Sequence, residues 1–167
     1  FAESRRRITP EKALALKKAL NDGIQAVGVF VDERIENILD ICSRGIIDVI
    51  QLHGQENQDY IDRLRDKGKK PIIKAVRVRS GEDIEGAAAL SCNYLLLDAY
   101  SEKAQGGTGE TFNWSLAGRV RKPFFLAGGL NRHNIRQAVA DLTPFGVDIS
   151  SGVESDKVKD RDKILEI

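Results

Sequence analysis

The sequence of 167 residues has no methionine, one tryptophan and only two cysteines. Cys42 and Cys92 are too few for a disulfide framework, and the absence of a signal peptide favours a reducing, cytoplasmic location. No stretch approaches the roughly 18 consecutive apolar residues of a membrane helix, so we expect no membrane partner. His53 and His133 are the only histidines, and no group of residues has metal-ligand spacing, so neither a metal nor a cofactor is expected.

Neither sign of charge dominates the chain. It carries 26 basic and 25 acidic residues, for a formal net charge of +1, and this balance argues against a surface that binds nucleic acid. With 41% hydrophobic and 31% charged residues, the composition is that of a globular protein. We therefore expect a single domain over residues 1–167.

Six apolar, strand-like runs recur along the chain. They begin at residues 27, 48, 72, 94, 124 and 147, which places successive runs 21 to 30 residues apart. This spacing corresponds to one strand and one helix per repeat, and nearly continuous apolar runs indicate strands buried on both faces. The fold class is therefore expected to be α/β with a parallel sheet.

Helical patterns lie between the runs. Thr9-Pro10 is a start signal, and the leucines that follow it predict a helix ending near Asn21-Asp22-Gly23. Ser80 and Asp83 resemble a capping box. Further helices are predicted around residues 35–42 and 60–64, after Asn113, after Asn131, and from Arg161 to Ile167. Each apolar face is expected to pack on the sheet.

The repeats favour a (β/α)8 barrel. Six strands and a possible stub at Phe1-Ala2 would leave such a barrel short of one N-terminal strand and helix, about 35 residues. We therefore expect the barrel to be incomplete at the N-terminus, with the missing segment either removed or supplied by another chain. An open doubly wound sheet is the alternative architecture.

Small residues follow the last two strands. Gly128 and Gly129 follow Phe124-Phe-Leu-Ala127, while Ser151 and Gly152 follow Gly146-Val-Asp-Ile149. Such positions leave backbone N–H groups open to an anion, and barrels often bind phosphate after strands seven and eight. The sequence predicts a phosphorylated small-molecule ligand.

Asp98 is the strongest catalytic candidate. Leu95-Leu-Leu97 would carry it to the rim at the carboxyl end of its strand, where a partly desolvated carboxyl is suited to donate a proton. A helix cap or an ion pair is the structural alternative. The long glycine-rich loop that follows, with Gly106-Gly-Thr-Gly109, is expected to be either a lid or a tolerated insertion.

Taken together and in order, these motifs resemble the phosphoribosylanthranilate isomerase family of tryptophan biosynthesis. The resemblance spans essentially all of the chain. It rests on these segments: Val27-Gly-Val-Phe-Val31, Val49-Ile-Gln-Leu-His-Gly54, Leu95-Leu-Leu-Asp98 with Gly106-Gly-Thr-Gly109, Leu126-Ala-Gly-Gly-Leu130 and Gly146-Val-Asp-Ile-Ser-Ser-Gly-Val-Glu154.

The resemblance implies a (β/α)8 barrel that converts N-(5'-phosphoribosyl)anthranilate to 1-(2-carboxyphenylamino)-1-deoxyribulose 5-phosphate by an Amadori rearrangement, without metal or cofactor. It implies that Asp98 is the general acid and that Arg6, or Arg5 or Arg7, holds the anthranilate carboxylate. His53 would line the anthranilate pocket, unless it is a structural hydrogen-bonding residue. Asp148 would contact a hydroxyl, and Gly128, Gly129, Ser151 and Gly152 would bind phosphate.

The family's general base is a cysteine on the first strand, in a Lys-Ile-Cys-Gly type of motif that residues 1–167 lack. Cys42 lies in a predicted helix, and Cys92 precedes its strand, so we assign no catalytic base and expect the activity of this chain to be impaired. Two other hypotheses are open. One is a non-catalytic phosphosugar-binding fragment that associates through open sheet edges. The other is a different phosphate-binding barrel enzyme. The chain itself is expected to be a monomer or a homodimer.

Overall fold

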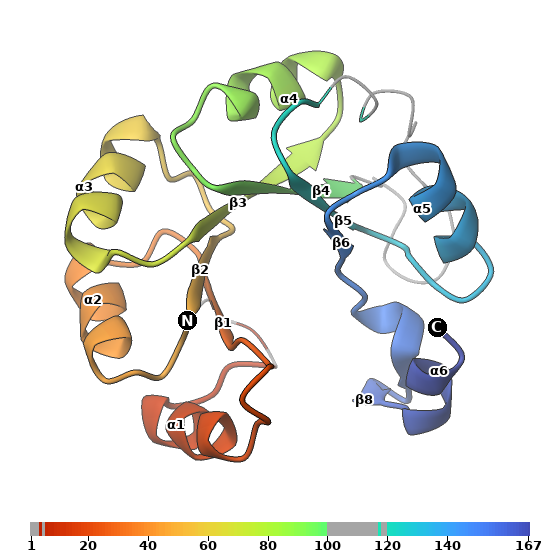
Figure 1. Ribbon diagram of the computed structural model, residues 1–167, viewed down its shortest axis with the longest axis horizontal. Helices are drawn as coiled ribbons and strands as arrows, with labels where there is room; N and C mark the ends of the chain where they lie inside the picture. The colour runs from red at the N-terminus through yellow and green to blue at the C-terminus, as the bar shows by residue number, and fades with distance from the viewer. Residues whose placement is uncertain (1–3, 5, 100–116, 118–119) are drawn as a thin grey trace. The chain divides into compact units, whose positions relative to one another are not determined.

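The computed structural model describes residues 4, 6–99, 117 and 120–167, and its fold is α/β (Figure 1). One sheet contains six strands in the order β1-β2-β3-β4-β5-β6, which is also their order in the sequence. Their bounds are β1 Val27–Phe30, β2 Val49–Leu52, β3 Ile72–Val78, β4 Tyr94–Ala99, β5 Phe124–Ala127 and β6 Gly146–Val147. The six predicted strands are thus confirmed, each within a few residues.

The backbone forms two compact units. The first comprises residues 1–75 and 90–94, and the second comprises residues 76–89 and 95–167. In the first, β1 pairs in parallel with β2, and β2 pairs in parallel with β3. In the second, β4 pairs in parallel with β5, and β5 pairs in parallel with β6. A parallel sheet joined by helices is what the repeat spacing predicts.

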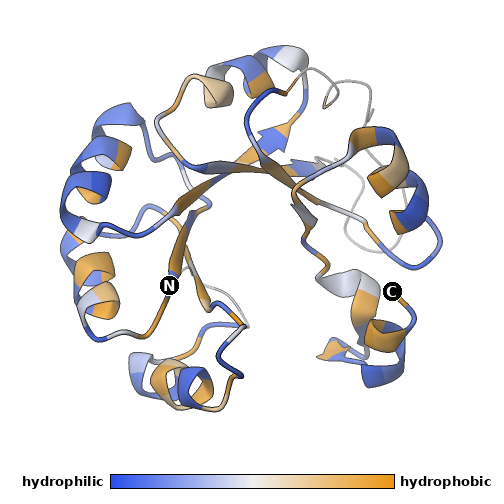
Figure 2. Ribbon diagram, in the orientation of Figure 1, coloured by the Kyte–Doolittle hydropathy of each residue, from blue (hydrophilic) through white to orange (hydrophobic). Residues whose placement is uncertain are grey.

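Helices α2 (Ile35–Ser43) and α3 (Gln58–Gly68) pack beside each other in the first unit (Figure 1). They bury Ile35, Ile38 and Ile41 from α2, and Ile61 and Leu64 from α3. In Figure 2, α3 carries hydrophilic residues on the side away from the strands, whereas the strands are mostly hydrophobic. The predicted apolar faces are therefore confirmed for these two helices.

Helix α1 (Pro10–Lys18) begins where predicted, since the side chain of Thr9 accepts a hydrogen bond from the Lys12 N–H. Two expectations about it are wrong. It ends at Lys18, ahead of the Asn21-Asp22-Gly23 signal, and it buries none of its residues; Leu16 is 52% exposed. Nor is β1 covered on both faces, because the alternate side chains of Val27 and Val29 are 45% and 46% exposed, whereas Phe30 is buried.

An ion pair joins α1 to the start of β2. Lys17 donates to the carboxylate of Asp48, which also accepts from the Ala26 N–H at 2.7 Å. These two hydrogen bonds hold the pKa of Asp48 below its ordinary value. The deprotonated carboxylate therefore stabilises the folded state of this unit.

We expect this carboxylate to make stability acid-sensitive. A lowered folded pKa contributes stability that is present above the unfolded pKa, near 3.9, and is lost as pH falls through the folded value. Asp48→Asn should lower the free energy of unfolding by about 1 kcal/mol at pH 7 and flatten its fall below about pH 4. Urea titrations between pH 2.5 and 7 would measure both effects. Asp66→Asn, at an exposed position of α3, is the matched control; an equal effect in both variants would contradict the prediction.

The second unit begins with α4 (Gly81–Ala88), whose capping box of Ser80 and Asp83 is present as predicted. Helix α5 (Ile135–Leu142) follows β5, and α6 (Arg161–Leu165) lies near the C-terminus. The helix predicted after Asn113 lies outside the described residues. No helix in the described ranges is long and apolar enough to cross a membrane.

A short antiparallel hairpin of β7 (Glu154–Ser155) and β8 (Val158–Lys159) follows the predicted phosphate segment, and the sequence analysis did not predict it. Its turn residues, Asp156 and Lys157, have φ angles of 50° and 66°. Glycine or asparagine usually occupies such turn positions, so the Asp156-Lys157 pair gives little indication of a turn in the sequence. The hairpin lies between the 3-10 turn at Ser151–Val153 and α6.

Candidate active site

The carboxyl ends of β4 and β5 bring Asp98 next to the glycine pair. Asp98 is the register partner of Ala127, the last residue of β5, and is half-buried. Gly128 and Gly129 follow at once with φ angles of 85° and 67°, a region that residues with side chains rarely adopt. Asp98 therefore lies at the same end of the sheet as this turn.

The chain after β6 returns to the segment after β5. The Asp148 N–H donates to the Leu126 carbonyl at 2.8 Å, so exposed Asp148 lies at the same sheet end. At Gly152, a Cβ atom would overlap the Leu130 carbonyl oxygen and lie 3.0 Å from its carbonyl carbon. Only glycine allows this approach of two backbones.

Side-chain amides hold the turn after β5. Asn131 Nδ2 and Asn134 Nδ2 both donate to the Gly129 carbonyl, at 3.1 and 3.0 Å. Lys159 Nζ donates similarly to the Ser150 carbonyl at 2.7 Å. These bonds use carbonyl oxygens, so the donors hold both loops without occupying their N–H groups.

The first unit carries the other two predicted site residues. His53 follows β2, is half-buried, and its N–H donates to the Phe30 carbonyl at 2.8 Å. Its Nδ1 lies 3.3 Å from Gln51 Nε2. Arg6 is exposed in the turn before α1, where its N–H donates to Ser4 Oγ at 3.1 Å. Arg5 lies outside the described residues.

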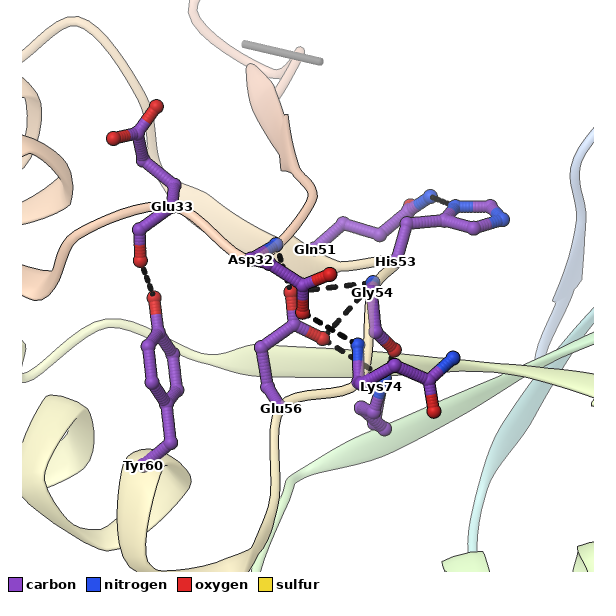
Figure 3. Close-up of polar contacts among 9 residues, drawn as sticks. Asp32, Glu33, Gln51, His53, Gly54, Glu56, Tyr60 and Lys74 are labelled. Atoms are coloured by element: carbon purple, nitrogen blue, oxygen red, sulfur yellow. Dashed lines mark hydrogen bonds and ion pairs between the residues drawn. The ribbon is translucent and has the colours of Figure 1, made fainter.

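The structure also shows a polar cluster around two buried charged residues, Glu56 and Lys74, that the sequence analysis missed (Figure 3). It consists of Asp32, Gly54, Glu56 and Lys74, at the ends of β1 and β2 and within β3. One feature of the sequence could have indicated this cluster. Lys74 is a lone lysine inside the apolar run Ile72-Ile-Lys-Ala-Val76, and a buried ammonium requires a partner.

Tyr60 borders this cluster. Its hydroxyl donates to the Glu33 carbonyl at 2.6 Å (Figure 3). Burial, together with the charges of Glu56 and Glu33, raises the pKa of Tyr60 to about 12. The phenol therefore stays protonated and ties α3 to the segment after β1.

Comparison with known families agrees with the geometry of this sheet end. A model of the family described as N-(5'phosphoribosyl)anthranilate (PRA) isomerase matches residues 1–167. The chain belongs to this isomerase family. The motifs that carried the resemblance are therefore those of true relatives.

Individual relatives give the same result. An N-(5'-phosphoribosyl)anthranilate isomerase of Endomicrobium trichonymphae is 48% identical over 99% of this chain and 82% of its own length. The crystal structure of the Thermotoga maritima enzyme has a TM-score of 0.86 at 37% identity, over 98% of this chain and 80% of that one. Another solved isomerase, in complex with reduced 1-(o-carboxyphenylamino)-1-deoxyribulose 5-phosphate, has a TM-score of 0.80 at 35% identity, over 98% and 79% of the two chains.

Neither cysteine lies at the carboxyl end of a strand. Cys42 is half-buried in α2, and burial raises the pKa of its thiol, which disfavours the thiolate. Cys92 is buried and precedes β4, at the amino end of that strand. The glycine-rich segment 106–109 lies outside the described residues. Within the described ranges, no three His, Cys, Asp or Glu residues are grouped to hold a metal ion.

Proposed function

We propose that the chain converts N-(5'-phosphoribosyl)anthranilate to 1-(2-carboxyphenylamino)-1-deoxyribulose 5-phosphate, with Asp98 as the general acid. The reaction is the family's step in tryptophan biosynthesis. The observation that carries the assignment of Asp98 is its register with Ala127, immediately ahead of the Gly128-Gly129 turn. A half-buried carboxyl beside a glycine turn suits proton transfer to a phosphosugar.

The chemistry needs one acid and one base. Asp98 gives its proton to the ribose ring oxygen as the bond from C1' to that oxygen breaks, and the ring opens to a Schiff base. A base then removes the C2' proton, and the enolamine that results relaxes to the ketone. No atom is gained or lost overall, so no oxidant or reductant is needed. Residues 1–167 supply the acid, and we assign no base among them.

The phosphate lies, on this proposal, between the loops that follow β5 and β6. Gly128 and Gly129 supply backbone N–H groups on one side, and Ser151 and Gly152 supply them on the other. The close approach of Gly152 to Leu130 supports this arrangement, because it joins the two loops. Asp148, exposed at the same sheet end, is proposed to accept a hydrogen bond from a ribose hydroxyl.

The anthranilate half is assigned to the first unit. Arg6 is proposed to bind the carboxylate through its planar guanidinium, and His53 to line the aromatic ring. Both assignments rest on the family resemblance and on the exposure of Arg6 and the rim position of His53. A (β/α)8 barrel of the family type, a single domain, a cytoplasmic location and a monomeric or homodimeric state complete the proposal.

Turnover of phosphoribosylanthranilate tests this function. We expect the protein to bind the reduced product analogue and to turn over substrate. Analogue binding without turnover would favour the non-catalytic alternative, and absence of both would refute the proposal.

A further inference from the structure

A buried ion pair in the first unit has no place in the proposed chemistry. Lys74 Nζ lies 3.0 Å from Glu56 Oε2, and the two side chains are 8% and 0% exposed. Charged side chains are seldom so deeply buried, and desolvation offsets most of the attraction within such a pair. Stability alone is therefore a weak reason for these two residues.

The pair bonds both backbone polar groups of Gly54, the residue after His53. Glu56 accepts the Gly54 N–H, at 2.9 Å to Oε2 and 3.2 Å to Oε1, and Lys74 Nζ donates to the Gly54 carbonyl at 2.7 Å (Figure 3). Gly54 directly follows His53. With its N–H and its carbonyl both bonded, the turn after β2 has little freedom to rotate.

The contacts of Glu56 and Lys74 with Gly54 lie just beyond the last row of register partners in the first unit. In that row, Phe30 pairs with Leu52, and Leu52 pairs with Lys74. Past this row, the His53 N–H still donates to the Phe30 carbonyl, and the side chains of Glu56 and Lys74 bond the backbone of the next residue, Gly54. The Lys74 side chain thus extends from this row to the Gly54 carbonyl.

The same carboxylate also holds the end of β1. Glu56 Oε1 accepts the Asp32 N–H at 2.9 Å, and Asp32 Oδ1 accepts the Gln55 N–H at 2.6 Å. Asp32 has a φ of 47°, which is uncommon for a residue with a side chain and requires support from its surroundings. At Gly54 an added Cβ would overlap the Asp32 carboxylate and lie 2.7 Å from its backbone nitrogen. The two rim segments are thus locked together.

We propose that Glu56 and Lys74 are positioning residues that fix the His53-Gly54 turn, and through it the place of His53 at the anthranilate half of the site. The inference rests on the proposed role of His53 in substrate binding. Neither Glu56 nor Lys74 needs to touch the substrate. Their effect passes through the Gly54 peptide and the backbone of Asp32.

Two double variants separate this positioning role from a merely structural one. Glu56→Leu with Lys74→Met replaces the pair by apolar side chains of similar size, a change that buried ion pairs often tolerate without loss of stability. It removes every hydrogen bond to Gly54 and Asp32 from the pair. Glu56→Gln with Lys74→Met also removes both charges but keeps one oxygen that can accept the two N–H groups.

Amide hydrogen exchange of the ligand-free protein measures directly how well the pair protects the N–H groups that it bonds. We expect exchange at Gly54 and Asp32 to become about tenfold faster in the Leu/Met variant, as the loss of one hydrogen bond implies, and to change less in the Gln/Met variant. Amides of α2 and α3 should be unchanged. Equal exchange at Gly54 in the wild type and the Leu/Met variant would overturn the proposal.

Ligand titration measures how the loss of the pair changes binding at the proposed site. We expect the dissociation constant of the reduced product analogue to rise about tenfold in the Leu/Met variant, from the same lost hydrogen bonding, while that of inorganic phosphate stays within about twofold. The dissociation constant of the analogue for the Gln/Met variant should lie between that of the wild type and that of the Leu/Met variant. Unchanged analogue affinity, or an equal loss for the analogue and phosphate, would overturn the proposal.

Ile61→Val is the matched control, because Ile61 is fully buried in α3 of the same unit and belongs to no site. It should lower stability without changing either dissociation constant. Failure of the proposed function looks different: the wild-type protein would bind inorganic phosphate but not the analogue. Hydrogen exchange would then still decide whether the pair holds the turn.

Discussion

Asp98→Asn is expected to lower kcat for phosphoribosylanthranilate by about 10²- to 10⁴-fold, the usual range for loss of a general acid. The amide fills the same volume and can still hydrogen-bond, but it cannot hand over a proton to the ribose ring oxygen. Binding should survive, because Gly128, Gly129 and Gly152 are untouched. The measurement is steady-state turnover, alongside titration with the reduced product analogue.

Asp141→Asn is the control for this experiment. Asp141 lies exposed on α5 in the same unit, where it accepts a hydrogen bond from Gln137. Its replacement should leave kcat and the dissociation constant of the analogue unchanged. A variant at Asp98 that retains the wild-type kcat would exclude this residue as the acid. One that loses binding and turnover by the same factor would indicate a binding role instead.

Gly152→Ala is expected to weaken phosphate binding and folding together. The new methyl group would overlap the Leu130 carbonyl, and its neighbours are backbone atoms that cannot rotate away. Overpacking of this kind costs about 1–3 kcal/mol of stability. If half of that cost appears as displacement of the two loops, the dissociation constant of inorganic phosphate should rise by about 2- to 13-fold. Urea denaturation and phosphate titration measure the two effects.

Gly86→Ala is the control in the same unit, and we expect it to have the opposite effect on stability. Gly86 lies inside α4, and a Cβ there would meet nothing within 4 Å. Alanine should raise stability by about 0.5–1 kcal/mol through its higher helix propensity and leave phosphate affinity unchanged. Similar destabilisation by both variants would mean that the contact with Leu130 is not what constrains Gly152.

Much of the fold could be predicted because its signals are local. Thr9-Pro10 caps α1 as its sequence indicates, and Ser80 with Asp83 caps α4. A cap depends on residues three positions apart, so neighbouring sequence contains all the information. Strand runs were found for the same reason, since burial on both faces leaves an uninterrupted apolar run.

Other features failed prediction because they depend on what packs against them. The leucines of α1 have helical spacing, yet α1 buries none of its residues, and spacing alone cannot say which surface is covered. The hairpin at residues 154–159 escaped notice because Asp156 and Lys157 adopt positive φ without glycine. Tertiary surroundings outweighed local preference at both places.

The sequence by itself determined the family, the order of strands and helices, and the short motifs at the strand ends, including Asp98 and the glycine pair. Only the tertiary structure decided which of these meet. The register of Asp98 with Ala127, the approach of Gly152 to Leu130 and the pairing of Glu56 with Lys74 join residues 18 to 29 positions apart. Such contacts depend on how strands align and how backbones approach, and no local pattern of residue types encodes that alignment.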